Sequence, residues 1–225
     1  MLSILKSLMK QNLVFMNLFS WIYNILHYNN SWKYKLRNTI SYSGAFLKGS
    51  SFHIRGKNNI IEFGPKARLF NCSITIIGSN CNLKIGGSHT IISNVHFWLQ
   101  DDNSTIVIGE NFTMEGGHIA STEGDSITIG NNCMFSEDVE IRNGDSHSII
   151  DAVSGKRLNK AQSVIIKEHV WLTAHVRVLK GAVIPSNSIV GNSSVVTSKF
   201  EKENALYSGV PCRFLKEGIN WDRYK

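Results

Sequence analysis

From Ile166 to Val196, apolar and polar residues follow a strict six-residue period. The successive segments are IKEHVW, LTAHVR, VLKGAV, IPSNSI and VGNSSV, and each begins with Ile, Leu or Val. The fifth residue is always small or β-branched, and these positions are Val170, Val176, Ala182, Ser188 and Ser194. A fixed period of this kind predicts short strands joined by tight corners, with the first residue of each segment pointing into a core.

Three six-residue segments make one triangular coil, so residues 18 apart are expected to stack in columns. Such pairs are Ile166 with Ile184, and Leu172 with Val190. Adjacent coils would then be about 4.8 Å apart, the spacing of paired strands. Upstream the rhythm is looser, with an aliphatic or aromatic residue before Gly at Phe63, Ile77, Ile85, Ile108 and Ile129. We expect coils with longer corners there, and an antiparallel sandwich is the alternative for residues 50–140.

The N-terminal segment has a different pattern. Residues 13–26, LVFMNLFSWIYNIL, are mostly apolar, and on a helix three of their polar residues form one stripe with the next residue, His27: Asn17, Ser20 and Asn24. The segment is short for a membrane span, and no small-residue cleavage site follows it, so we expect no signal peptide. Two interpretations remain open. The helix packs on the domain or on a sister subunit, or it lies on a membrane surface, which the preceding Lys6 and Lys10 favour.

Composition narrows the choice of partners. The chain of 225 residues carries a net charge of +7, which favours solubility or an anionic partner such as a cofactor phosphate, an acidic glycan or a membrane surface. The basic residues are dispersed, so we do not expect nucleic-acid binding. The four cysteines form no CxxC pair and match no zinc spacing: Cys72, Cys81, Cys133 and Cys212. Cys81 and Cys133 fall at the small position of a six-residue segment, which indicates buried thiols in a reducing compartment.

One stretch, RNGDSHSIID at residues 142–151, interrupts the repeat. Ile141 and Ile166 are 25 residues apart, so the count of six is lost and the chain must leave the prism over residues 142–163. A histidine, His147, lies at the start of this excursion. The last residues, 201–225, also leave the pattern. Val210-Pro211 predicts a turn, and CRFLKEG predicts a short helix that ends at Gly218.

A family resemblance follows from these segments. The run HVWLTAHVRVLKGAVIPSNSIVGNSSVVTS, followed by YSGVPCRFLKE, resembles the hexapeptide-repeat acyltransferases, whose fold is a left-handed parallel β-helix. More narrowly, IRNGDSHSIIDAVSGKRLN followed by VIIKEHVWL is similar to bacterial polysaccharide O-acetyltransferases that act on polysialic acid, capsule or O-antigen. The resemblance implies an all-β domain at 46–200 with the loop 142–163, a helical segment at 1–45, and a turn with a short helix at 201–225.

The same resemblance implies a function. Such enzymes transfer acetyl from acetyl-CoA to a sugar hydroxyl, and they are homotrimers with sites between the subunits. No metal takes part, and the expected location is the cytoplasm or the inner face of the membrane. The family's catalytic histidine matches His147, the general base, and its tryptophan matches Trp171. The chain departs from the family at residues 172–175, where relatives are Gly-rich, and at 210–212, Val-Pro-Cys, where relatives have Asn-Pro-Ala.

Further candidates follow from chemistry. Stacking of the coils is expected to leave His147 about 5–10 Å from Trp171, which should point outward to cover coenzyme A or sugar, with subunit packing as the alternative. Candidate donor-binding residues are Trp171, Thr173, Ala174, Lys180, Arg213 and Lys216. Candidate acceptor-binding residues are Asn143, Asp145, Lys156, Arg157 and Trp98. Their alternative roles are a turn for Asn143 and Asp145, a solvated surface for the basic residues, and core packing for Trp98.

Three other functions are the alternatives to O-acetyl transfer: zinc-dependent hydration, N-acetylation and a non-catalytic scaffold. Zinc hydration would need three stacked histidines, but the six-residue spacing of His169 and His175 puts them on successive faces. N-acetylation of an amino sugar or nucleotide sugar is the nearest enzymatic alternative. A non-catalytic β-helix scaffold is the alternative from another class.

Overall fold

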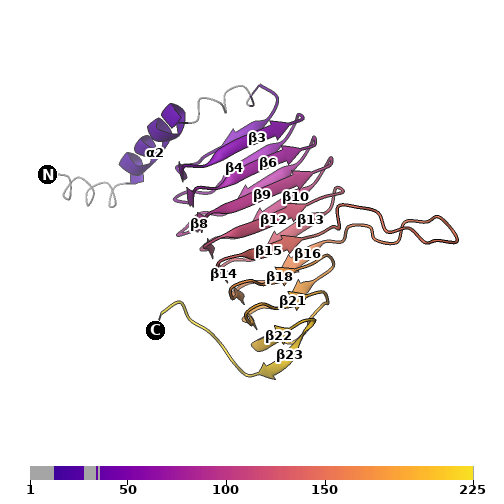
Figure 1. Ribbon diagram of the computed structural model, residues 1–225. Helices are drawn as coiled ribbons and strands as arrows, with labels where there is room; N and C mark the ends of the chain where they lie inside the picture. The colour runs from indigo at the N-terminus through magenta and orange to yellow at the C-terminus, as the bar shows by residue number, and fades with distance from the viewer. Residues whose placement is uncertain (1–12, 28–33, 35, 225) are drawn as a thin grey trace.

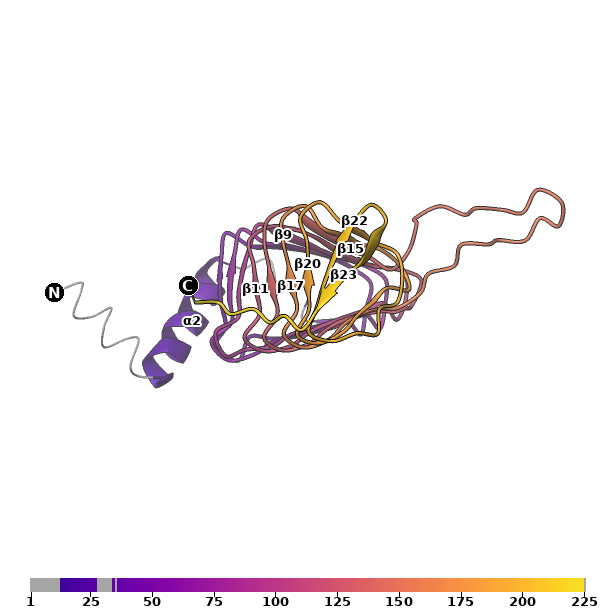
Figure 2. The same cartoon turned by 90° about the horizontal axis from the view of Figure 1, so that it is seen from below.

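The computed structural model describes residues 13–27, 34 and 36–224, and its strands form a stack of coils (Figure 1). Each coil adds one strand to each of three sheets, and the sheets are the faces of a prism. Figure 2 shows the coils from below, lying over one another, with one long excursion leaving the prism. We call the faces the first, second and third sheets.

The first sheet has seven strands in the order of the chain: β1 (Thr39–Ser41), β4 (Ile60–Phe63), β7 (Asn82–Ile85), β10 (Thr105–Ile108), β13 (Ser126–Ile129), β16 (Val164–Ile166) and β19 (Val183–Ile184). The second sheet has nine: β2 (Phe46–Lys48), β5 (Arg68–Phe70), β8 (Ile91–Ser93), β11 (Thr113–Met114), β14 (Met134–Phe135), β17 (Trp171–Leu172), β20 (Ile189–Val190), β22 (Ala205–Gly209) and β23 (Cys212–Glu217). The third sheet has seven: β3 (Ser51–Arg55), β6 (Ser73–Ile77), β9 (Val95–Gln100), β12 (Gly117–Ser121), β15 (Val139–Arg142), β18 (Arg177–Val178) and β21 (Val195–Val196).

The register confirms the predicted columns. Ile166 pairs with Ile184 on β19, and Leu172 pairs with Val190 on β20. Upstream coils are longer, since Ile106 pairs with Leu83 on one side and with Ile127 on the other. All of these strands are parallel, which rules out the antiparallel sandwich. The coils begin with β1, ahead of the boundary expected at residue 46.

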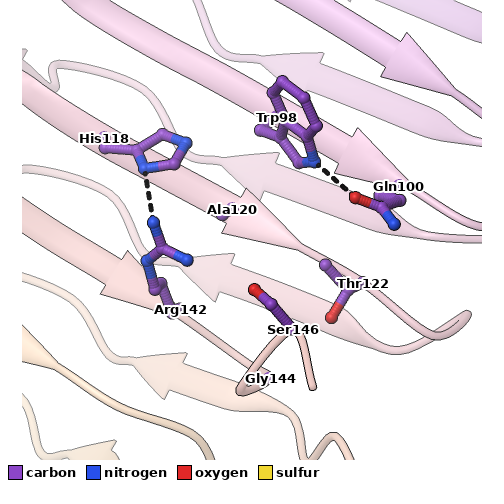
Figure 3. A pocket seen from close by; sticks show the side chains of 8 residues that line it. All are labelled: Trp98, Gln100, His118, Ala120, Thr122, Arg142, Gly144 and Ser146. Carbon is purple, nitrogen blue, oxygen red and sulfur yellow. Dashed lines mark hydrogen bonds between the residues drawn. The ribbon is translucent and has the colours of Figure 1, made fainter.

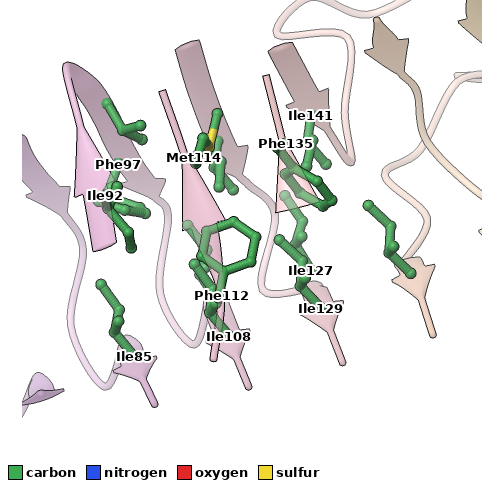
Figure 4. Packing of buried hydrophobic residues seen from close by; sticks show 14 of the residues in the cluster. Ile85, Ile92, Phe97, Ile108, Phe112, Met114, Ile127, Ile129, Phe135 and Ile141 are labelled. Atoms are coloured by element: carbon green, nitrogen blue, oxygen red, sulfur yellow. The ribbon is translucent and has the colours of Figure 1, made fainter. Parts of the chain in front are cut away.

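The core is filled as the pattern predicts. Ile85, Ile108 and Ile129 of successive coils are buried one above another, and the rings of Phe112 and Phe135 pack on each other beside them (Figure 4). The small fifth positions from Val170 to Ser194 are fully buried beside the corners. The four cysteines are buried and unpaired, and burial raises the pKa of the Cys133 thiol to about 12, so it stays a neutral packing group.

Asparagines allow the corners to turn. Asn111 and Asn132 take left-handed backbone conformations, with φ of 52° and 61°. Asparagine tolerates this region better than other residues with a side chain, because its short polar group bonds locally. Here the amides also bond between coils, with Asn111 Nδ2 donating to Asn132 Oδ1 over 2.9 Å. The frequent asparagines of the sequence therefore form the corners of successive coils.

Helix α2 (Leu13–His27) lies against the first coil (Figure 1). Tyr23 contacts the ring of Phe46 on β2 with ring centroids 4.7 Å apart, so the helix packs on its own domain. Ser20 and Asn24 of the predicted polar stripe are buried, while the side chains of Asn17 and His27 lie outside the described residues, as do 1–12, 28–33 and 35 of the expected N-terminal segment. Of the helices in the described part of the chain, none has both the length and the apolar composition that crossing a bilayer requires.

The predicted short helix near the C-terminus is wrong. Residues 212–217 form strand β23, which pairs antiparallel with β22 at the end of the second sheet. The unpaired edge of β22 supplies backbone partners that an isolated six-residue helix lacks, and tertiary pairing outweighs helix propensity. After the hairpin the chain returns across the second sheet, where Arg223 donates to the carbonyl oxygens of Asn111 and Cys133, each over 2.8 Å.

Candidate active site

The interruption after Ile141 is an excursion from the prism, as predicted. It leaves the corner between β15 of the third sheet and β16 of the first sheet and extends far from the coils (Figures 1 and 2). A backbone bridge between Ile150 and Arg157 joins its two arms. His147 lies on the outgoing arm, and its side chain is exposed to solvent. The fold therefore presents an accessible imidazole outside the regular faces.

Asn159 holds the base of this loop together. Its buried side chain accepts a hydrogen bond from the backbone N–H of Ile149 over 2.7 Å. Its Nδ2 donates to the backbone oxygen of His147 over 2.7 Å and to Asp145 Oδ2 over 2.8 Å. One amide thus fixes both sides of the histidine. The sequence analysis did not identify Asn159, because its partners are 10 to 14 residues away on the other arm.

Replacement of Asn159 by alanine is expected to release the histidine arm. The variant loses four side-chain hydrogen bonds at the loop and none in the prism, so we expect kcat to fall about tenfold from lost orientation, with little change in melting temperature. Steady-state kinetics and thermal unfolding would measure both. The matched control is Asn192→Ala, an exposed asparagine at another corner, and a kcat equal to that of the control would contradict the role of Asn159.

Asp145 and Lys180 form an ion pair at the foot of the loop. The Lys180 ammonium lowers the pKa of the Asp145 carboxyl, which stays ionised. Lys180 is the residue predicted to bind the donor, and the structure places it beside Asp145 at the foot of the loop. The Asp145 carboxylate bonds Lys180 and Asn159, and the backbone oxygen of Asp145 accepts the His147 N–H over 2.7 Å.

Arg157 is paired with Glu123, which changes its predicted role. Its Nη1 donates to Glu123 Oε2 over 3.0 Å, and its pKa is raised by this carboxylate. An acceptor carboxylate would have to compete with Glu123, so we assign Arg157 to holding the returning arm on the coil before. Lys156, next to it near the tip, is exposed.

Asn143 belongs to the framework, in contrast to its predicted contact with acceptor. Its side chain is fully buried, and Oδ1 accepts the backbone N–H of Thr122 over 2.8 Å while Nδ2 donates to the Thr122 oxygen over 3.2 Å. A group so enclosed and bonded is not available to a sugar. Asn143 instead anchors the start of the excursion to the preceding coil.

A pocket of about 220 Å³ lies on the third sheet, directly beside the loop (Figure 3). Its lining residues come from three successive coils and the loop base: Trp98, Gln100, His118, Ala120, Thr122, Arg142, Gly144 and Ser146. Strand register explains the hollow, because Ala120 sits between Trp98 and Arg142 in one column and its methyl group leaves the space between them open. The lining contains an indole, a guanidinium and polar groups, but no carboxylate.

The predicted acceptor residue Trp98 therefore lies on the outer face and lines a pocket, which excludes core packing as its role. Sequence reasoning missed its neighbours His118 and Arg142. A signal for them exists, since His96, His118 and Glu140 are spaced by 22 residues, as are Trp98, Ala120 and Arg142. The regular six-residue segments downstream predict a period of 18 instead, which hides this period of 22.

His118 is held neutral within this pocket. Its ring stacks on His96 with centroids 4.9 Å apart, and Arg142 Nη2 lies 3.4 Å from its Nδ1. Burial, with the charges of His96 and Arg142, lowers the pKa of His118 to about 4. Within the described residues its Nε2 has no hydrogen-bond partner. Since Arg142 donates to Nδ1, the ring proton lies on Nε2, which is left with a free donor.

Acid is expected to destabilise the fold through His118. Its pKa in the folded state, about 4, is below its ordinary value of 6.5, so the unfolded chain takes up a proton first as the pH falls. The stabilisation is present above pH 6.5 and is lost between 6.5 and 4. Because His118 is partly exposed, solvent screens part of the effect, so we expect the free energy of unfolding to fall by about 1–2 kcal/mol over this range. Chemical denaturation at several pH values gives the free energy of unfolding as a function of pH. Between pH 6.5 and 4 this free energy should fall less steeply in His118→Gln than in the wild type, and an equal fall in both proteins would contradict the prediction.

Trp171 begins β17 on the outer face of the second sheet, since the following Leu172 is buried. Its ring lies 6.1 Å from that of Trp221, which the returning tail brings over the sheet and which stacks on His169 at 4.2 Å. Its indole Nε1 is buried, and among the described residues it has no acceptor. A buried donor without a partner costs about 1–3 kcal/mol, which suits a group that bonds a ligand or another subunit.

The other donor candidates follow the second sheet from Trp171. Thr173 and Ala174 come just after β17 and are partly buried, and Thr173 Oγ1 donates to the Val190 oxygen over 2.8 Å. Arg213 and Lys216 are exposed on β23, a strand rather than a helix. The order β17-β20-β22-β23 puts them three strand spacings from Trp171, about 14 Å.

The two predicted catalytic residues are not brought together within one subunit. His147 leaves the corner between the third and first sheets, whereas Trp171 begins the second sheet, and the whole of β16 lies between those corners. This strand order does not support the expected separation of 5–10 Å within a single chain. Among the residues described, no group of three or more His, Cys, Asp or Glu is placed to hold a metal ion.

A prism of six-residue repeats, interrupted by a loop that carries a histidine, is the architecture of a hexapeptide-repeat acyltransferase. No protein-family profile matches the chain. A polysialic acid O-acetyltransferase of Neisseria meningitidis is 32% identical over 192 residues, which are 84% of this chain and 87% of the relative. The crystal structure of the polysialic acid O-acetyltransferase OatWY, also 32% identical, covers 84% of this chain and 88% of its own with a TM-score of 0.79.

A second relative, the polysialic acid O-acetyltransferase of Escherichia coli O1:K1, is 32% identical over 120 residues, 53% of this chain and 39% of the relative. The chain belongs to the polysialic acid O-acetyltransferase family of left-handed β-helix proteins. It is an O-acetyltransferase. Its β-helix is left-handed, as in the other members of the family.

Proposed function

We propose that the protein transfers acetyl from acetyl-CoA to a hydroxyl of an acidic capsule polysaccharide, a polymer that contains sialic acid. The observation that carries the acceptor class is the pocket beside the His147 loop. Arg142, which bonds Glu140 through Nε, brings its guanidinium to the lining, Trp98 gives a flat apolar surface for a sugar ring, and none of the lining residues is a carboxylate. The names of the two relatives support the same acceptor.

His147 acts as the general base in this proposal. A hydroxyl is a poor nucleophile at neutral pH, and an imidazole that accepts its proton makes oxygen attack on the thioester carbonyl feasible. The tetrahedral species collapses by breaking the carbon–sulfur bond. The proton held by His147 then passes to the departing thiolate, so the histidine returns to its neutral form. The clamp by Asn159 and the ion pair of Asp145 keep the histidine arm at the edge of the pocket.

The donor is proposed to lie along the second sheet. The free Nε1 of Trp171 would bond the donor near its acetyl end, Thr173 and Ala174 would border the pantetheine arm, and Arg213 and Lys216 would meet phosphates at the hairpin. Because base and donor groove belong to different corners of one prism, the site forms when the loop of one subunit reaches the second sheet of another. This arrangement requires a homotrimer or another closed oligomer.

Labelled acetyl-CoA and purified protein test the proposal. We expect label on a sialic acid polymer, little on its carboxyl-reduced form and little on a neutral glycan. Mild alkali should release the label, because esters are cleaved while amides survive. Alkali-resistant label would indicate N-acetylation, and absence of transfer to every glycan would favour a scaffold. A preference for neutral glycans would exclude the acidic acceptor and any contact of Lys156 with its carboxylate.

A further inference from the structure

Helix α2 is attached to the prism by its polar side. Ser20 and Asn24 are buried, and Asn24 bonds the backbone on both sides of Phe46, donating from Nδ2 to the Ala45 oxygen over 2.9 Å and accepting from the Leu47 N–H over 3.4 Å. Strand β2 is the outermost strand of the second sheet, so this side chain satisfies an edge that no earlier coil covers. The bonds of Asn24 fix the rotation of the helix about its axis.

With this rotation, the apolar face of the helix points to solvent. Phe15 and Trp21 are each 60% exposed, and Leu18 and Ile22 are 50% and 42% exposed. The spacing of three and four residues places these side chains on one side of the helix. Leu18 and Trp21 also border a hollow against the first corner of the prism near Tyr42. An exposed patch of large apolar side chains is uncommon on a soluble surface and indicates a partner.

The charge of the chain identifies the partner. Residues 1–61 contain eight Lys or Arg residues and no Asp or Glu, whereas the rest of the chain has 16 basic and 17 acidic residues. Those described in this segment, Arg37, Lys48, Arg55 and Lys57, are exposed on the first coils, at the end of the prism where α2 lies (Figure 1). A second copy of the same face would repel it. An anionic surface attracts it, by about 1 kcal/mol for each basic residue close to a lipid headgroup layer.

We propose that α2 and the basic end of the prism bind the surface of an anionic lipid bilayer, with the apolar face of the helix entering the headgroup region. The 15 described residues of the helix are fewer than a membrane span needs, and the bonds of Asn24 hold their polar side on the prism, so we expect this helix to lie along the surface. The excursion with His147 leaves the far side of the prism from α2 and starts several coils below it (Figure 1), so the site stays in water while the enzyme is held at the membrane. The proposal does not depend on the acceptor proposed above.

Co-sedimentation of the full-length protein with vesicles tests this inference. We expect binding to vesicles of equal parts phosphatidylcholine and phosphatidylglycerol, weak binding to phosphatidylcholine alone, and loss of binding as salt is raised. The double variant Phe15→Ser, Trp21→Ser should bind at least about tenfold more weakly, because each large side chain contributes about 1.5–3 kcal/mol when buried. Its turnover of a soluble acceptor should be unchanged. The matched control is Leu215→Ser, an equally exposed residue at the opposite end of the prism, which should bind like the wild type.

Two results would overturn the proposal. One is a wild-type protein that stays in the supernatant with the anionic vesicles. The other is a double variant that binds them as well as the control. If the face is instead an interface between copies of this chain, the vesicles capture nothing and light scattering shows a lower mass for the double variant.

Discussion

Replacement of His147 by alanine is expected to lower kcat by about 10²–10⁴-fold, the usual contribution of a positioned general base. The side chain is exposed and packs on nothing in the core, so the prism and its melting temperature should be unaffected. Asn159 bonds the backbone oxygen at this position, and that bond survives the substitution. The measurement is release of coenzyme A thiol at saturating donor and acceptor.

The matched control is His175→Ala. His175 is also an exposed histidine at a corner, but it bonds Asp138 and lies away from the excursion. It should keep wild-type turnover. Full activity in His147→Ala would show that another group accepts the proton, and equal losses in both variants would point to a general effect on the fold.

Replacement of Arg142 by glutamine is expected to raise KM for an acidic polymer by about 10–100-fold. A hydrogen bond between guanidinium and carboxylate contributes about 1.5–3 kcal/mol, and glutamine removes the charge but keeps a polar group of similar reach. The fold should tolerate the change, because Glu140, the other partner of Arg142, stays paired with Arg177 over 3.2 Å. The effect should be on KM rather than on kcat, since the base is untouched.

Arg142→Lys is the control, because it keeps the charge and loses only the paired geometry, so its KM should lie between those of the wild type and the glutamine variant. The carboxyl-reduced polymer supplies a second control. If Arg142 recognises the carboxylate, wild type and Arg142→Gln should use the reduced polymer equally poorly. A KM for the acidic polymer that is insensitive to Arg142→Gln would place the acceptor elsewhere.

Much of the fold could be predicted from the sequence because it is local and periodic. Ile166 and Ile184 stack as the six-residue period requires. The chain leaves the prism at residues 142–163, where that period is interrupted. The hairpin of β22 and β23 could not be predicted in this way. Residues 212–217 do not prefer a helix or a strand strongly by themselves. They form a strand because they pair with the edge of β22, which comes earlier in the chain.

The site was predictable only in part, for the same reason. His147 and Trp98 carry chemistry that stands out in a sequence, whereas Arg142, His118 and Asn159 gain their roles from partners on neighbouring coils or on the opposite arm. Arg157 and Lys180 show the opposite case. Each was expected to meet a ligand, and each is paired with a carboxylate of this chain, which charge counting along a sequence does not reveal.

That His147 and Trp171 act together only across a subunit boundary is tested most directly by mixing two inactive variants. His147→Ala and Trp171→Ala subunits are unfolded together, refolded in equal amounts and assayed for transfer to a sialic acid polymer. In a random trimer, about a quarter of the boundaries join an intact His147 to an intact Trp171, so we predict up to about a quarter of wild-type activity. Activity no greater than that of the two variants assayed separately would contradict a shared site.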